Sequence, residues 1–144
     1  GLMMNYKKDF VTRKRVKDGC AFFNMSWSPR TRVNRYVITR SIPSRPGIFE
    51  LYYKDQNGKI NLFYMERVWY GGLRSEIRRA SDPLEVSDTA RRRVLSKFQC
   101  YYRYTIVESK ADMRDLLHIY SEALLPQDEP PASSGRYEKI FIDG

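Results

Sequence analysis

Residues 46–79 combine residue types that can handle phosphate. The segment holds tyrosines, glutamates and an arginine-rich stretch that includes Arg74 and Arg78. An arginine guanidinium keeps its charge and offers several N–H donors in a plane, which suits phosphate oxygens. A solvated helix surface would account for the same arginines equally well. The segment is therefore a candidate phosphate-binding site. Whether its side chains meet depends on the strands and helices that hold them.

Excess positive charge is concentrated in residues 1–45. They hold eleven Lys or Arg and two Asp, while residues 46–144 hold fifteen basic and fifteen acidic side chains, so the net charge of +9 belongs to the first segment. Such a segment can bind nucleic acid by neutralising phosphates and releasing counterions. Alternatively, it could bind another anionic surface or serve only as a solvated tail. We expect a basic N-terminal extension that contacts nucleic acid through Lys7, Lys8, Arg13, Lys14, Arg15, Lys17, Arg30 and Arg32.

Aromatic residues lie among these basic residues. Phe10, Phe22, Phe23 and Trp27 could stack on bases, although packing in a core is the more frequent outcome for such side chains.

A β-hairpin is the strongest local prediction. Asn57-Gly58 separates two apolar runs, and a type I′ turn needs positive φ at both central residues. A two-residue loop would place Phe49 opposite Glu66, Leu51 opposite Tyr64 and Tyr53 opposite Leu62, all on one face. The segment would then hold Tyr64 and Glu66 side by side.

The remaining elements alternate in type along the chain. Polar and apolar residues alternate over Arg32 to Thr39, which favours an edge strand, and Ser109 to Asp112 forms a capping box before a helix. The predicted order is an edge strand (32–39), hairpin strands (47–54 and 59–66), two helices (73–80 and 88–98), a strand (99–107), a helix (109–124) and a final strand (137–142).

Gly47-Ile48-Phe49, followed by Tyr64-Met65-Glu66, resembles the two motifs of the GIY-YIG nuclease superfamily. Leu73, Arg74, Ile77 and Arg78 resemble the helix after its second motif, and residues 104–109 resemble its third strand. The resemblance covers residues 46–126. It implies an α+β fold with a small three-stranded antiparallel sheet, formed by the hairpin plus one strand and flanked by helices.

The resemblance also implies a chemistry. Family members cleave nucleic-acid phosphodiester bonds with one divalent metal: a tyrosine orients or deprotonates water, an arginine offsets phosphoryl charge and a carboxylate holds Mg²⁺ or Mn²⁺. Tyr64 matches the tyrosine of the second motif, Arg78 is the best match for the arginine and Arg74 is the next. For the metal, Glu66 and Asp115 are the candidate ligands.

The sequence departs from the family motifs at two positions, and these departures leave two functional hypotheses. Phe49 stands where the first motif has tyrosine, and Glu66 replaces the glycine of the second. One hypothesis is a divergent metal-dependent endonuclease acting on nucleic acid, DNA in preference to RNA. The other is a catalytically inactive nuclease-fold module for nucleic-acid binding or protein interaction.

Several classes find no support in the sequence. It has no P-loop, dinucleotide fingerprint, zinc spacing or nucleophile elbow, and no apolar run long enough for a membrane span. Cys20 and Cys100 could pair, but free thiols in a reducing cytoplasm are the favoured interpretation. We expect a cytoplasmic protein with an extension over 1–45 and one α+β domain over 46–144.

Overall fold

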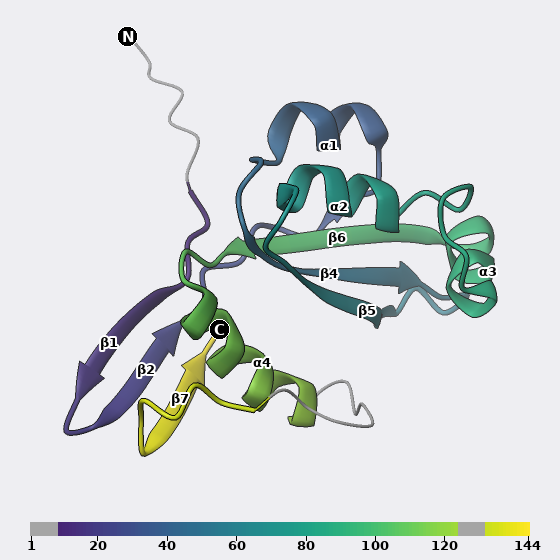
Figure 1. Cartoon of the computed structure of the whole chain (residues 1–144). Helices are drawn as coiled ribbons and strands as arrows, with labels where there is room; N and C mark the ends of the chain where they lie inside the picture. The colour runs from purple at the N-terminus through teal and green to yellow at the C-terminus, as the bar shows by residue number, and fades with distance from the viewer. Residues whose placement is uncertain (1–8, 124–131) are drawn as a thin grey trace, which may run out of the picture.

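A four-stranded antiparallel sheet forms one half of the molecule. The computed structural model describes residues 9–123 and 132–144. The sheet has the order β3-β6-β4-β5, with strands β3 (Thr31–Arg32), β4 (Gly47–Lys54), β5 (Ile60–Val68) and β6 (Gln99–Ile106). Its three long strands are those expected from the hairpin plus one strand, and the protein is α+β as predicted (Figure 1).

The hairpin confirms part of the predicted register and corrects the turn. Phe49 pairs with Glu66 and Leu51 with Tyr64, but a bulge after Leu51 places Tyr52, rather than Tyr53, opposite Leu62. The predicted type I′ turn is wrong, because Gly58 has positive φ and Asn57 does not. The Asp55 carboxylate instead accepts the backbone N–H groups of Asn57 and Lys59, each at 2.9 Å. This side chain stabilises a longer loop than two residues.

Two helices cover one face of the four-stranded sheet. They are α1 (Arg35–Ser41) and α2 (Gly72–Ala80), and they pack on a core that includes Phe49 and Leu51 of β4. The edge strand predicted over residues 32–39 is wrong. The Asn34 side chain caps α1 by accepting the N–H groups of Tyr36 and Val37, so the chain turns into a helix there.

The other helices agree with the sequence prediction in type and place. Helix α3 (Thr89–Lys97) begins after Asp88, whose carboxylate accepts the N–H of Arg91 at 2.8 Å. Helix α4 (Lys110–Ala123) follows β6, and the predicted end of this helix at residue 124 lies outside the described residues. In the described chain no helix is both long and apolar enough to cross a membrane.

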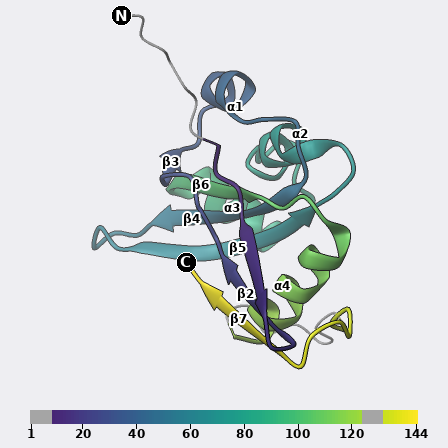
Figure 2. The same ribbon diagram turned by 90° about the vertical axis from the view of Figure 1, so that its left-hand side faces the viewer.

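A second sheet was not predicted. Strands β1 (Arg13–Lys17), β2 (Cys20–Asn24) and β7 (Lys139–Asp143) form it in the order β1-β2-β7, with β2 and β7 parallel. Asp18 and Gly19 both have positive φ and form the tight turn between β1 and β2. Figure 2 shows β1, β2 and β7 beside α4, away from α1 and α2.

Residues 11–45, expected as a basic extension, are thus built into both halves of the molecule. They supply β1 and β2 to the second sheet, β3 to the first, and helix α1. Between the sheets, a core from α4, β2 and the inner face of the first sheet includes Phe23, Ile48 and Leu116. Both cysteines are free thiols, as expected.

Candidate functional site

Tyr64 and Glu66 lie next to each other on the same face of β5, as the register predicts. Burial raises the pKa of the Glu66 carboxyl and outweighs the effect of its hydrogen bond with Tyr64. The pKa of the Tyr64 phenol is also raised, by burial and then by the nearby Glu66 charge. A carboxyl that retains its proton more readily is a poorer metal ligand, because metals bind the deprotonated form.

The ring of Tyr64 has two close neighbours. Phe49, which is fully buried, lies 6.0 Å away between ring centroids. The guanidinium of Arg91 from α3 lies 3.9 Å from the Tyr64 ring centroid, a cation–π contact. Arg91 is the arginine that the fold brings to Tyr64, and the sequence did not single it out as a site residue.

Arg74 and Arg78 lie elsewhere. The Nε of Arg74 donates to the carbonyl oxygen of Ile42 at 2.6 Å, which ties α2 to the end of α1. Arg78 is exposed and lines a polar hollow with Arg35 of α1. The α2 side chains whose charges act on Glu66 are Glu76 and Arg79. The structure therefore does not bring the two predicted arginines together with Tyr64 and Glu66.

Asp115 is also separate from Glu66. It is 1% exposed on α4, and its carboxylate accepts three hydrogen bonds: from the backbone N–H of Ser134 at 2.7 Å, the Ser134 hydroxyl at 2.8 Å and Arg136 at 2.7 Å. These contacts fasten the chain before β7 to α4. In residues 9–123 and 132–144, no three His, Cys, Asp or Glu side chains gather closely enough to hold a metal ion.

We expect Asp115→Asn to lower stability at pH 7 and to flatten the acid unfolding profile. Burial acts to raise the pKa of Asp115, but the hydrogen bonds from Ser134 and Arg136 outweigh it and lower the pKa below the usual range of an aspartate. A carboxyl with a lowered folded-state pKa stabilises the fold above its unfolded pKa, and this contribution is lost as the pH falls through the folded pKa.

Urea unfolding at pH 7, 5 and 3 measures this effect. The difference in free energy of unfolding between wild type and Asp115→Asn should shrink toward pH 3. Asp143→Asn, which changes an exposed carboxylate, is the control and should leave the profile unchanged. A wild-type and an Asp115→Asn profile that stay parallel from pH 7 to 3 would contradict the assignment.

The predicted basic residues separate into groups. Lys7 and Lys8 lie outside the described residues. Lys14 faces α4, where its ammonium donates to Asp112 at 2.9 Å and to the Tyr137 hydroxyl at 2.7 Å. The guanidinium of Arg30 packs 4.5 Å from the Tyr52 ring centroid, and Arg32 is exposed on β3. Only Arg13, Arg15 and Lys17 share one face of the second sheet, because they alternate along β1.

That outer face combines cations with stacked aromatic rings. The register places Arg15, Phe22 and Phe141 in one row across the sheet. The rings of Phe22 and Phe141 stack with centroids 5.0 Å apart at 12°, and the Arg15 guanidinium lies 4.7 Å from the Phe22 centroid. Phe141 is 47% exposed. We call this surface the outer face; its side chains are Arg13, Arg15, Lys17, Cys20, Phe22, Asn24, Lys139, Phe141 and Asp143.

The sequence singled out four of the nine side chains of the outer face. Arg13, Arg15 and Lys17 were expected to contact nucleic acid, and Phe22 was considered for stacking. Phe141 and Lys139 were missed because they join the surface through the parallel pairing of β7 with β2, which no local pattern indicates.

A buried ionic network was also missed. Glu50, 1% exposed in the middle of β4, accepts hydrogen bonds from Arg103 Nε and from the Tyr52 hydroxyl, both at 2.5 Å. Burial, and then the hydrogen bond to Glu50, raise the pKa of Tyr52 to about 12. The Arg103 guanidinium also lies 4.1 Å from the ring centroid of Trp27. This network links the two halves of the molecule rather than forming an open site.

Comparison with known proteins places the chain in a family. No curated protein and no solved structure matches it at a significant level. A family model described as "Uncharacterised protein" matches residues 11–144, a range that includes both sheets and the four helices of the described residues. Because this match covers well over half of the chain, the protein belongs to that family of uncharacterised proteins.

Proposed function

We propose that this protein is a nuclease-like module that binds single-stranded nucleic acid on the outer face and does not hydrolyse it. The observation that carries the proposal is the pair of stacked rings, Phe22 and Phe141, set among Arg13, Arg15, Lys17 and Lys139.

Each part of this surface has a counterpart in a nucleic-acid strand. An exposed aromatic ring can stack on any unpaired base, whereas the bases of a duplex are already stacked on each other. Exposed Arg and Lys side chains neutralise phosphates and release counterions. Because β1 carries Arg13, Arg15 and Lys17 while β2 and β7 carry the rings, a single strand can place its bases on the rings and its backbone along β1.

The predicted catalytic residues support binding rather than hydrolysis. Phe49 has no hydroxyl, Arg74 is bonded to Ile42, and Arg78 lies at the hollow with Arg35. Asp115 is held by Ser134 and Arg136. A one-metal phosphodiester mechanism needs tyrosine, arginine and carboxylate around a single phosphate. Arg74, Arg78 and Asp115 instead serve parts of the fold away from Tyr64.

Removing the rings of the outer face should weaken single-strand binding. For Phe22→Ala/Phe141→Ala we expect about a 10-fold to 100-fold loss of affinity, since base–aromatic stacking is worth about 1–3 kcal/mol per base. Arg13→Ala/Arg15→Ala/Lys17→Ala should instead flatten the dependence of log affinity on log salt, by about 2 for three lost phosphate contacts. Fluorescence anisotropy with labelled DNA and RNA strands at several salt concentrations measures both effects.

A matched control removes the same charge from another surface. Lys54→Ala/Lys59→Ala/Arg67→Ala changes three exposed cations of the β4–β5 hairpin and should leave the salt slope near that of the wild type. Equal losses in both triple variants would mean that net charge alone binds the strand. Unchanged affinity of a folded Phe22→Ala/Phe141→Ala protein would exclude the outer face as the binding surface.

Metal-dependent hydrolysis is the second candidate function. It is favoured by one observation, the contact between Tyr64 and Glu66 on β5, with Arg91 over the Tyr64 ring. Incubation of labelled strands and plasmid with Mg²⁺ or Mn²⁺ separates the two candidates. Cleavage by the wild type that Tyr64→Phe and Glu66→Gln both abolish would establish this function in place of binding alone.

A further inference from the structure

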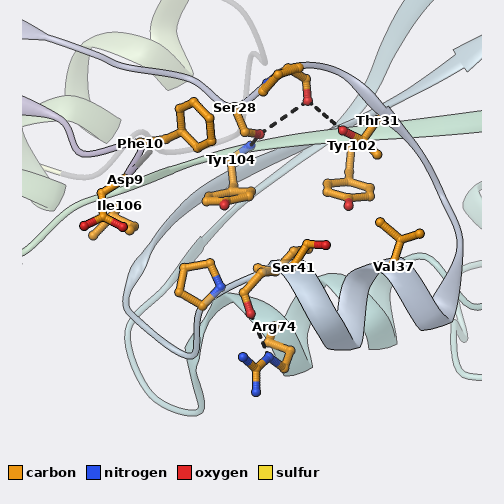
Figure 3. A pocket seen from close by; sticks show the side chains of 13 residues that line it. Asp9, Phe10, Ser28, Thr31, Val37, Ser41, Arg74, Tyr102, Tyr104 and Ile106 are labelled. Atoms are coloured by element: carbon orange, nitrogen blue, oxygen red, sulfur yellow. Dashed lines mark hydrogen bonds between the residues drawn. The ribbon is translucent and has the colours of Figure 1, made fainter. Parts of the chain in front are cut away.

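A pocket of about 460 Å³ lies between β6 and α1, on the side of the molecule that carries α1 and α2 (Figure 3). Its volume falls in the range of about 300–1,000 Å³ that is usual for small-molecule sites. Phe10, Val37, Ile42 and Ile106 supply apolar wall. The pocket therefore suits a ligand with an apolar body.

Two tyrosines are among the polar side chains of this pocket. Tyr102 and Tyr104 alternate along β6, so both side chains leave the same face of the strand. Figure 3 shows their rings side by side, with Val37 and Ser41 of α1 across from them. Aromatic rings at a pocket are complementary to a flat aromatic ligand, which can stack on a ring face or meet its edge.

The Tyr104 hydroxyl is left for a ligand. Tyr104 is 8% exposed, and among the described residues burial and the charge of Asp9, with no hydrogen bond, raise the pKa of its hydroxyl, whereas the Tyr102 hydroxyl is hydrogen-bonded with Thr31. Burial raises the pKa of both phenols, to about 12 for Tyr102, so they remain neutral donors at pH 7. The hydroxyl is at the pocket, where an acceptor atom on a ligand could take its hydrogen bond in place of solvent.

Among the described residues, the pocket is lined by one acidic and one basic side chain. Asp9 lines one part of it and Arg74 another, and the Arg74 Nε is already bonded to the carbonyl oxygen of Ile42. The site thus has no cluster of one sign that would select a strongly charged ligand.

We propose that this pocket binds a neutral, planar heteroaromatic molecule with a hydrogen-bond acceptor, the chemical class to which nucleobases belong. The ligand stacks on the rings of Tyr102 and Tyr104 and accepts a hydrogen bond from the Tyr104 hydroxyl. This site is separate from the outer face and does not depend on the proposed single-strand binding. The base can come from a free nucleoside or from a nucleic-acid strand.

Titration of the full chain with adenosine, guanosine, cytidine and uridine, followed by ligand-observed NMR, tests the proposal. We expect saturable binding of at least one nucleoside. Tyr104→Phe keeps the ring and removes the hydrogen-bond donor. It should weaken binding by about 5-fold to 10-fold, because one hydrogen bond contributes about 1–1.5 kcal/mol. Ser41→Trp fills the pocket from an exposed position of α1 and should abolish binding.

Tyr101→Phe is the matched control. It removes a hydroxyl from the opposite face of the same strand, where Tyr101 donates to Gln99, and it should bind like the wild type. A Tyr104-dependent loss of oligonucleotide affinity would identify a strand base as the source, and nucleoside binding without that loss would identify a free molecule. The proposal is wrong if no nucleoside saturates the protein, or if folded Tyr104→Phe and Ser41→Trp proteins both bind like the wild type.

Discussion

Replacing Arg103 by leucine is expected to lower the free energy of unfolding by about 3–5 kcal/mol, the usual cost of removing one partner of a buried ion pair. Glu50 is 1% exposed and would keep a carboxylate in the core without its cation. The variant also loses the contact between the guanidinium and Trp27. The cost is large because a buried charge is far more expensive unpaired than paired.

A double variant distinguishes the unpaired charge from lost packing. Glu50→Gln/Arg103→Leu removes the buried carboxylate charge. The glutamine side chain can still accept a hydrogen bond from the Tyr52 hydroxyl. It should be more stable than Arg103→Leu alone, by at least about 1 kcal/mol in urea unfolding. If the double variant is as unstable as the single one, packing of Arg103 against Trp27, and not its charge, stabilises this part of the protein.

Gly47→Ala is expected to be about as damaging as a severe core mutation, with a loss of about 3 kcal/mol or more. A Cβ at this position would overlap the carbonyl oxygen of Thr105 and lie 2.8 Å from Cδ1 of Leu73. The oxygen belongs to the neighbouring strand β6, which pairs with β4 at this point, so it cannot move without breaking the sheet. Close approach of two backbones is thus one reason for glycine at the start of this strand.

Gly58→Ala provides the comparison. Gly58 has φ +79° in the hairpin loop, and a Cβ there meets no atom closer than 4.0 Å. We expect a loss of about 1 kcal/mol from the left-handed backbone alone. Thermal and urea unfolding of the two variants should therefore differ by about 2 kcal/mol. Equal losses would show that β4 and β6 can separate at Gly47 to admit a methyl group.

Local patterns predicted the elements that depend on nearby residues. The hairpin, α2, α3, β6 and α4 follow from apolar periodicity and capping residues, and the strand register correctly places Tyr64 beside Glu66. The edge strand predicted over residues 32–39 failed because alternation was given more weight than the cap at Asn34. The turn failed because the carboxylate of Asp55, outside the Asn-Gly pair, holds a longer loop.

Contacts between residues far apart in the sequence could not be predicted from local patterns. Phe22 and Phe141 meet only through the pairing of β2 with β7, and Arg91 reaches Tyr64 only because α3 packs near β5. Arg78 and Arg74 on α2 were predicted to act with Tyr64 as the catalytic arginine, but Arg74 donates to the carbonyl oxygen of Ile42 instead. Side-chain direction on a short helix depends on which face the core buries, here Leu73 and Ile77.

The pairing of β2 with β7 has a consequence for the speed of folding. Its partners, such as Cys20 and Lys139, lie at opposite ends of the chain, so the loop that this pairing closes is nearly as long as the protein. Contacts between residues so far apart in sequence form slowly, because the chain loses conformational freedom before the pairing repays it. The β4–β5 hairpin, by contrast, closes over a few residues. Most of the four-stranded sheet can therefore form while β2 still lacks its partner β7. The unpaired edge of β2 is then the surface most exposed to association between partly folded chains.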